Sequence, residues 1–164
     1  MEVFISRLVT SLWYSEKADE AAAFYASLLP DSKVDRVTAL PADSPSGAAG
    51  SVKIVESTLM GRPFIAMSAG PLDAFNHSIS FTVECDDQAE IDRLWAALSQ
   101  GGAVERCGWL KDRYGLYWQI VPSQLGDMIK DADRAQAKRV AEAMLKMVKF
   151  DIEGLRRAYE GRDS

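Results

Sequence analysis

The feature that most constrains this chain is an internal repeat. Two segments carry apolar residues at positions i, i+3, i+4 and i+7, and the second set follows the first by 70 residues (91 − 21 = 70). The paired positions are Ala21 and Ile91, Phe24 and Leu94, Tyr25 and Trp95, and Leu28 and Leu98. This spacing places each set on one face of a helix. Flanking apolar positions repeat at the same offset, Val9 with Ile79 and Val34 with Val104. The sequence therefore predicts two copies of a strand–helix–strand unit.

Each predicted helix is followed by three runs that are typical of strands. Residues 33–41, 51–60 and 63–68 follow the first helix, and residues 103–107, 109–112 and 116–122 follow the second. Glycine-containing links at Gly61 and Gly115 are typical of hairpin turns. Each half is therefore predicted to be a βαβββ module, with module 1 at about 7–70 and module 2 at about 76–122.

These modules predict an α+β fold. Two tandem βαβββ modules side by side would form a cupped, antiparallel-leaning mixed sheet with the helices on one face. The uncovered concave face can hold a small molecule. Residues 1–122 are expected to form this domain, and residues 123–164 a C-terminal helical extension of the same domain.

The C-terminal extension carries two further helical stripes. The first comprises Ala137, Val140, Met144, Met147 and Val148, and the second comprises Ile152, Leu155 and Tyr159. Asp151 lies between them as a predicted N-cap. We interpret the methionine-bearing stripe as a core or dimer contact, in preference to a cofactor site.

The chain contains few metal-binding or redox-active side chains. It has one histidine, His77, and two cysteines, Cys85 and Cys107. These numbers exclude zinc fingers and multi-histidine metal centres built within one chain. Two cysteines do not make a disulfide framework, so we expect a reducing compartment. We interpret both thiols as buried and unreactive.

Charge and hydropathy exclude other classes of protein. Lys plus Arg is 19 and Asp plus Glu is 24, which gives a net charge of −5. An acidic chain without a basic run is a poor binder of nucleic acid. No apolar run approaches the roughly 20 residues that span a bilayer, and the first residues lack the regions of a signal peptide. We therefore expect a cytoplasmic protein with neither a nucleic-acid nor a membrane partner.

The doubled module, with the run AFYASLL (23–29) on its first helix, resembles the vicinal oxygen chelate superfamily. That superfamily includes glyoxalase I, extradiol dioxygenases and the bleomycin- and fosfomycin-resistance proteins. Three segments are similar to its PhnB-like subgroup, which is often labelled 3-demethylubiquinone-9 3-methyltransferase. They are FNHSISFTVECDDQAEIDRLW (75–95), CGWLKDRYGLYWQIVP (107–122) and AEAMLKMVKFDIEGLRRAY (141–159). The resemblance covers residues 7–159 and implies the glyoxalase/bleomycin-resistance fold and a homodimer.

The methyltransferase label can be tested against the sequence. A doubly wound enzyme that uses S-adenosylmethionine needs a glycine-rich turn after its first parallel strand. The glycines of this chain are scattered among turns, such as Gly47, Gly50, Gly61 and Gly70. We therefore reject methyl transfer as the activity of this chain.

The resemblance also implies where a metal would bind. In the superfamily, His or Gln on the first strand of each module and Glu on the last enclose a divalent ion, which acts as a Lewis acid. The corresponding positions here are Thr10, Ile65, Ser80 and Gln119. None is charged, and neutral oxygens are weak ligands for a catalytic transition metal. We expect the usual metal site to be absent, and any divalent ion would depend on His77 and Gln119. The alternative for His77 is an edge residue bonded to backbone or water.

Strand alternation identifies further candidates for a ligand-binding cup. Tyr117 and Gln119 are expected to face the cup, with Trp118 turned toward the helix. Trp109 could stack on a planar ligand or pack in the core. Asp112 precedes a predicted hairpin and is interpreted as a turn-former.

The leading hypothesis is a PhnB-like protein that binds a small molecule in a metal-free cup. The candidate pocket residues are Thr10, Ser80, Trp109, Tyr117 and Gln119. One alternative is a divalent-metal-dependent isomerase, lyase or dioxygenase acting on a substrate with vicinal oxygens. A second is a protein-interaction or regulatory module that uses the helical extension. The sequence leaves open whether the chain is an enzyme.

Overall fold

The computed structural model describes residues 7–71 and 73–162. The chain divides into two compact units, residues 1–73 and 74–164. Residues 123–164, which the sequence predicts as a helical extension, belong to the second unit. Among the described residues, no helix combines the length and the apolar character needed to cross a bilayer.

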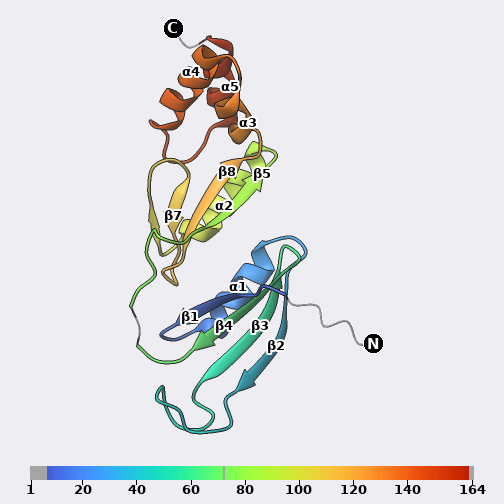
Figure 1. Cartoon of the computed structure of the whole chain (residues 1–164), viewed down its shortest axis with the longest axis vertical. Coiled ribbons are helices and arrows are strands. Elements are labelled where there is room, and N and C mark those ends of the chain that lie inside the picture. The colour runs from blue at the N-terminus through green and yellow to red at the C-terminus, as the bar shows by residue number, and fades with distance from the viewer. Residues whose placement is uncertain (1–6, 72, 163–164) are drawn as a thin grey trace. The chain divides into compact units, whose positions relative to one another are not determined.

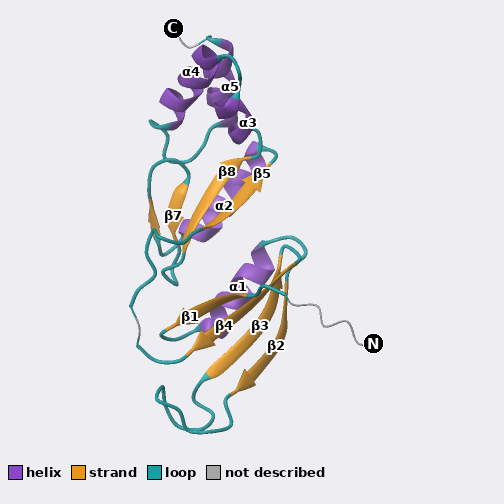
Figure 2. Ribbon diagram, viewed as in Figure 1, coloured by secondary structure: helices purple, strands orange, loops and turns teal. Residues whose placement is uncertain are grey.

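The first unit is a βαβββ module with a mixed four-stranded sheet (Figures 1 and 2). Its elements are β1 (Thr10–Tyr14), α1 (Ala18–Leu28), β2 (Lys33–Ala39), β3 (Lys53–Leu59) and β4 (Arg62–Ser68). The strand order is β1-β4-β3-β2, with β1 parallel to β4 and the other pairs antiparallel. Helix α1 covers one face and buries Ala21 and Tyr25 there. The other face carries no helix of its own module.

The second unit repeats this topology. Its elements are β5 (Phe81–Cys85), α2 (Gln88–Ser99), β6 (Ala103–Val104), β7 (Trp109–Lys111) and β8 (Tyr117–Pro122), in the sheet order β5-β8-β7-β6. Strand β5 is parallel to β8, as β1 is to β4. Helix α2 is capped by Asp87, whose carboxylate accepts the Glu90 N–H at 2.8 Å. The predicted α+β class and the doubled βαβββ module are confirmed.

The repeat offset differs between helices and strands. Ala18 and Gln88 begin the two helices, an offset of 70 (88 − 18), whereas Thr10 and Phe81 begin the two first strands, an offset of 71 (81 − 10). The reason is that residues 15–17 link β1 to α1, whereas residues 86–87 link β5 to α2. A single offset of 70 therefore misaligns the first strands by one residue. In a strand, a shift of one residue moves every side chain to the opposite face of the sheet.

The helical extension forms part of the second unit. It comprises α3 (Leu125–Lys130), α4 (Arg134–Met144) and α5 (Ile152–Glu160). Helices α4 and α5 contact each other and bury three residues of the predicted stripes, Ala137, Val140 and Leu155, together with Ala158, whereas Val148 is exposed. Between them, the Met147 and Val148 carbonyls accept the N–H groups of Cys107 and Gly108 at 2.9 and 2.8 Å. The core interpretation of the methionine-bearing stripe is thus supported, although Met144 and Met147 themselves are half-buried.

Candidate functional site

Each sheet has one face covered by its helix and one open face. In β8, Trp118 and Ile120 are buried on the helix side, and Tyr117, Gln119 and Val121 alternate onto the open face. We call these surfaces the module-1 open face and the module-2 open face. The alternation predicted for β8 agrees with the structure.

Four of the five predicted pocket residues lie on the module-2 open face. The Gln119 side-chain amide donates to Ser80 Oγ at 2.9 Å, and Trp109 lies opposite Gln119 in the β7–β8 ladder. Tyr117 lies one step further along the same face of β8 and is only 8% exposed. Ser80, Trp109, Tyr117 and Gln119 therefore form one continuous surface across β5, β8 and β7.

His77 completes this surface with a contact that the sequence analysis missed. Its Nε2 lies 2.8 and 3.0 Å from the two carboxylate oxygens of Glu105. Its ring lies 4.2 Å from the Tyr117 ring and 5.7 Å from the Trp109 ring, between centroids. The expected backbone or water partner is thus replaced by a carboxylate 28 residues away. No local pattern could have revealed this pair.

The structure corrects the placement of Thr10. It shares its side of β1 with Leu12 and Tyr14, which are buried on the helix-covered face. The β1 residue beside Ile65 is Ser11, just as Thr82 lies beside Gln119 in module 2. With the strand offset of 71, the counterpart of Ser80 is therefore Val9 (80 − 71 = 9), and Ser11 is the counterpart of Thr82.

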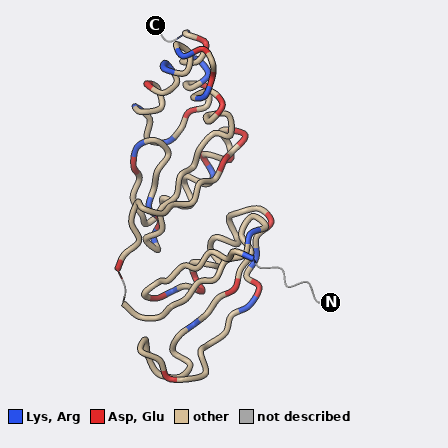
Figure 3. Tube along the Cα trace, viewed as in Figure 1, with Lys and Arg blue, Asp and Glu red and all other residues tan. Residues whose placement is uncertain are grey.

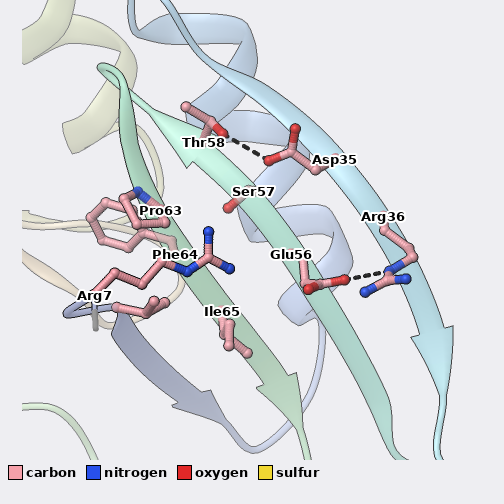
Figure 4. A pocket seen from close by; sticks show the side chains of 10 residues that line it. Arg7, Asp35, Arg36, Glu56, Ser57, Thr58, Pro63, Phe64 and Ile65 are labelled. Atoms are coloured by element: carbon pink, nitrogen blue, oxygen red, sulfur yellow. Dashed lines mark hydrogen bonds and ion pairs between the residues drawn. The ribbon is translucent and has the colours of Figure 1, made fainter. Parts of the chain in front are cut away.

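The module-1 open face contains a hollow of about 530 Å³. Figure 4 shows the side chains that surround it. They come from the segment before β1 and from β2, β3 and β4, and include Arg7, Asp35, Arg36, Glu56, Thr58 and Ile65. We call this the module-1 hollow. It is lined within a single module, and among its residues Ile65 had been matched to a ligand position of the superfamily and Val9 to the repeat.

Two polar pairs line the β2–β3 side of the hollow. Arg36 donates to the Glu56 carboxylate, and Thr58 Oγ1 donates to Asp35 Oδ2 at 2.8 Å. The hydrogen bond from Arg36, with smaller contributions from the charges of Arg36 and Arg7, holds the pKa of Glu56 below its ordinary value. The hydrogen bond from Thr58, assisted by Lys33, lowers the pKa of Asp35 in the same way. Both carboxylates are therefore ionised at neutral pH.

Arg7 is the cation of the hollow that has no such partner. Its side chain extends over β4 toward β3 (Figure 4). Within residues 7–71 and 73–162, no hydrogen bond or ion pair engages its guanidinium. A guanidinium with open donors matches the paired oxygens of a carboxylate or phosphate. The hollow thus offers one open cationic group beside two satisfied pairs and the apolar walls of Pro63 and Ile65.

The charged lining of the module-1 hollow could not be predicted from the sequence, because it depends on the register between strands β2 and β3. Arg36 pairs with Glu56 across β2 and β3, after a bulge between Val34 and Arg36. Alternation within 51–60 could have placed Glu56 opposite the buried Val55 face. The bulge shifts the pairing of β2 with β3 by one residue, and no pattern in the local sequence predicts it.

The residues on these faces do not form a conventional metal centre. In the part of the chain that the structure describes, no three His, Cys, Asp or Glu side chains gather as metal ligands. The Gln119 amide is hydrogen-bonded to the Ser80 hydroxyl, and the His77 Nε2 is hydrogen-bonded to the Glu105 carboxylate. The neighbouring open-face positions carry only hydroxyl or alkyl side chains, which are poor ligands for a transition metal. These positions are Ser11, Ile65 and Thr82.

The remaining candidates have structural surroundings. Trp118 donates its indole N–H to the buried Asp112 carboxylate at 2.9 Å, and Asp112 also accepts the N–H groups of Tyr114 and Leu116. This confirms Asp112 as a turn-former. Cys85 is buried and Cys107 is half-buried, and neither forms a disulfide. Burial, assisted by Glu90 and Asp87, raises the pKa of Cys85 to about 11.

Comparison with known proteins identifies the family. Residues 6–121 match the profile described as 3-demethylubiquinone-9 3-methyltransferase. The chain belongs to this 3-demethylubiquinone-9 3-methyltransferase family. No curated protein matches the chain. The family profile ends where the helical extension begins, so α3, α4 and α5 lie outside it.

Several solved structures resemble this chain. The PhnB protein from Bacillus cereus, which carries the same methyltransferase name, is 27% identical with a TM-score of 0.63, covering 71% of this chain and 99% of that protein. A Pseudomonas aeruginosa protein is 22% identical with a TM-score of 0.52, covering 72% and 98%. Leishmania major glyoxalase I is 16% identical with a TM-score of 0.50, covering 78% and 95%. The last two show the fold alone.

The family name does not describe the site. The links between the parallel strands and their helices are Ser15-Glu16-Lys17 in module 1 and Asp86-Asp87 in module 2. Neither contains a glycine, whereas a nucleotide-type cofactor needs a glycine turn there for close approach of the backbone. The open faces instead present hydroxyl, amide, aromatic and guanidinium groups.

Proposed function

We propose that this member of the 3-demethylubiquinone-9 3-methyltransferase family binds a small organic molecule on its open faces without a resident metal. The observation that carries this proposal is the module-1 hollow, in which Arg7 has open donors. A ligand with a carboxylate or phosphate group would meet Arg7, and its apolar portion would lie against Pro63 and Ile65. Independently of that hollow, the hydroxyl, amide and aromatic side chains of the module-2 open face offer hydrogen-bonding and stacking groups to a small molecule. Thr10 lies on the helix-covered side of β1 and is not part of this set, and Val9, which lines the module-1 hollow, is the counterpart of Ser80.

The proposal includes a cytoplasmic homodimer. The resemblance implies the dimer, and exposed apolar side chains, among them Leu145 and Val148, support an interface with a second copy. Two cysteines without a disulfide support a reducing compartment. Interleaved acidic and basic residues, with no long block of one sign (Figure 3), give no support for a nucleic-acid partner.

The binding proposal is tested by a ligand screen on protein purified without a histidine tag and treated with a chelator. Thermal shift with a panel of metabolites and antibiotics identifies ligands, and calorimetry then measures their affinity. Arg7→Gln should weaken binding of an anionic ligand about tenfold or more, because a charged hydrogen bond is lost. Arg156→Gln, which changes an exposed arginine on α5, serves as the matched control and should leave the affinity unchanged.

Metal analysis of the untagged protein before the chelator step tests the metal-dependent alternative, and that protein should carry no stoichiometric ion. Titration of the chelator-treated protein with Mn²⁺, Ni²⁺ and Zn²⁺ should leave ligand affinity unchanged. A stoichiometric ion that Gln119→Ala releases would overturn the metal-free proposal and favour a metal-dependent enzyme. If no ligand shifts the melting temperature while removal of 133–164 abolishes capture of a partner protein, the interaction alternative is favoured instead.

A further inference from the structure

One corner of the module-2 open face is filled by the chain's own imidazole. The His77 ring is tilted by 45° to the Tyr117 ring, with 4.2 Å between centroids, and by 44° to the Trp109 ring, with 5.7 Å between centroids. The Glu105 carboxylate accepts its Nε2–H. Aromatic faces and a carboxylate are the groups that bind a planar nitrogen cation. The His77 imidazole therefore occupies a position where the ring of a bound molecule could make the same contacts.

The three receptor side chains are fixed by the sheet. Glu105 directly follows β6, and its N–H donates to the Trp109 carbonyl of β7 at 2.8 Å, which holds these two residues next to each other. Tyr117 belongs to β8, which pairs with β7 and with β5. Strand ladders hold their side chains on one face in a defined geometry. We call Glu105, Trp109 and Tyr117 the aromatic corner.

His77, in contrast, comes from outside the sheet. It precedes β5 in a turn where Asn76 Oδ1 accepts the Ser78 N–H at 2.8 Å. Its side chain is 55% exposed, and the contacts described above are those that the structure gives its ring. Displacing the ring would therefore leave the sheet intact and would expose the aromatic corner.

We infer that the aromatic corner is a binding site for a planar cationic nitrogen group, and that His77 occupies it as an internal ligand. The chemical class is an imidazolium or a protonated nitrogen heterocycle carried by the bound molecule. Glu105 supplies the countercharge, and the other charged strand residues described on this face are Glu84 and Lys111. The inference rests on the proposed function, because it names the ligand group that the module-2 open face takes.

The test uses the full-length His77→Ala protein without a histidine tag and imidazole as the probe. At about pH 6 free imidazole is protonated, as an unperturbed histidine is. Imidazole should raise the melting temperature of His77→Ala and bind it in calorimetry with a Kd on the order of 1 mM. It should leave the melting temperature of wild-type protein unchanged, because His77 fills the corner. Pyrazole, a ring of the same shape that stays neutral, should bind more weakly.

Two variants connect the effect to the aromatic corner. Adding Glu105→Gln to His77→Ala should weaken imidazole binding about tenfold or more, because the charged acceptor is lost. Ser78→Ala, an adjacent exposed position, should behave as wild type. Imidazole that stabilises wild type and both His77→Ala proteins equally, or none of them, would overturn the inference.

A measurement on folded protein with His77 in place makes the test independent of His77→Ala. The chain has one histidine, so its ring resonances are identified in NMR spectra without assignment. Glu105→Gln should move the His77 Cε1–H resonance toward its position in unfolded protein. An unmoved resonance would show that Glu105 does not hold the ring. Ligand binding at Arg7 is measured separately, so loss of the module-1 function would leave these results unaffected.

Discussion

At the scale of single residues, Asp112 shows how a motif can be structural. It is 2% exposed and accepts hydrogen bonds from the Tyr114 and Leu116 backbone and from the Trp118 indole at 2.8, 3.0 and 2.9 Å. These donors neutralise the cost of burying the carboxylate. Its position within the run CGWLKD therefore reflects the β7–β8 turn.

Replacing Asp112 with alanine should destabilise the protein. The substitution leaves three buried donors without an acceptor, so the free energy of unfolding should fall by about 3 kcal/mol. Urea denaturation followed by circular dichroism measures the change. Asp112→Asn keeps one acceptor oxygen and should cost less, and Asp86→Asn, at an exposed position, should cost almost nothing. A loss in Asp112→Ala no larger than that in Asp86→Asn would contradict this explanation.

The two cysteines should differ in reactivity. Burial raises the pKa of Cys85 to about 11, so little thiolate forms at pH 8 and alkylation in the native protein should be slow. Iodoacetamide labelling and peptide mass spectrometry should find Cys107 modified before Cys85. Because the folded pKa of Cys85 is raised, the stability gained from its neutral thiol is full below the ordinary value of 9.0 and declines as the pH rises toward 11. Equal labelling of both thiols at pH 8 would refute the assignment.

At the scale of elements, the contact between the extension and module 2 depends on Gly108. Its φ is 75°, and a Cβ there would lie 2.5 Å from a ring carbon of Phe150 and 2.6 Å from the Ile120 carbonyl oxygen. Phe150 is 1% exposed and lies in the segment between α4 and α5. The glycine therefore permits the close approach that attaches the extension to the sheet.

Gly108→Ala should loosen the extension from the second module. The clash adds to the left-handed backbone strain, so the free energy of unfolding should fall by about 3 kcal/mol. Hydrogen exchange should increase at the N–H groups of residues 107 and 108. Gly61→Ala is the matched control, because Gly61 has a φ of 73° with no atom within 4 Å, and it should cost about 1 kcal/mol. Equal losses in the two variants would mean that the Phe150 contact is unimportant.

The element scale also shows where sequence reasoning succeeded and where it failed. The alternation of β8 was predicted because Trp118 and Ile120 form an unbroken apolar pattern over one strand. Thr10 was misplaced because one additional residue in the β1–α1 link changes the strand offset while leaving the helix offset intact. The Arg36–Glu56 pair was missed because a bulge sets its register. Local periodicity is encoded within an element, whereas register depends on the partner strand.

At the scale of the whole molecule, the assembly state is the testable expectation. The predicted dimer should give a light-scattering mass twice that of the chain. The double substitution Leu145→Glu and Val148→Glu introduces charge at two exposed apolar positions of the second unit. If these two positions lie at the interface, the double substitution should shift the measured mass toward that of the monomer, because burying the new charges opposes association. The helix content should not fall. A dimer mass that both substitutions leave unchanged would place the interface elsewhere, and a wild-type monomer would contradict the dimer.

The sequence by itself determined the doubled βαβββ module, the helix-covered faces and the scarcity of metal ligands, because these depend on periodicity and composition within short segments. The tertiary structure alone decided which side chains meet on the open faces. Glu105 reaches His77 across 28 residues, and Arg36 reaches Glu56 across 20. Such contacts depend on strand order, bulges and link lengths, and one residue of error in any of these moves a side chain to the opposite face.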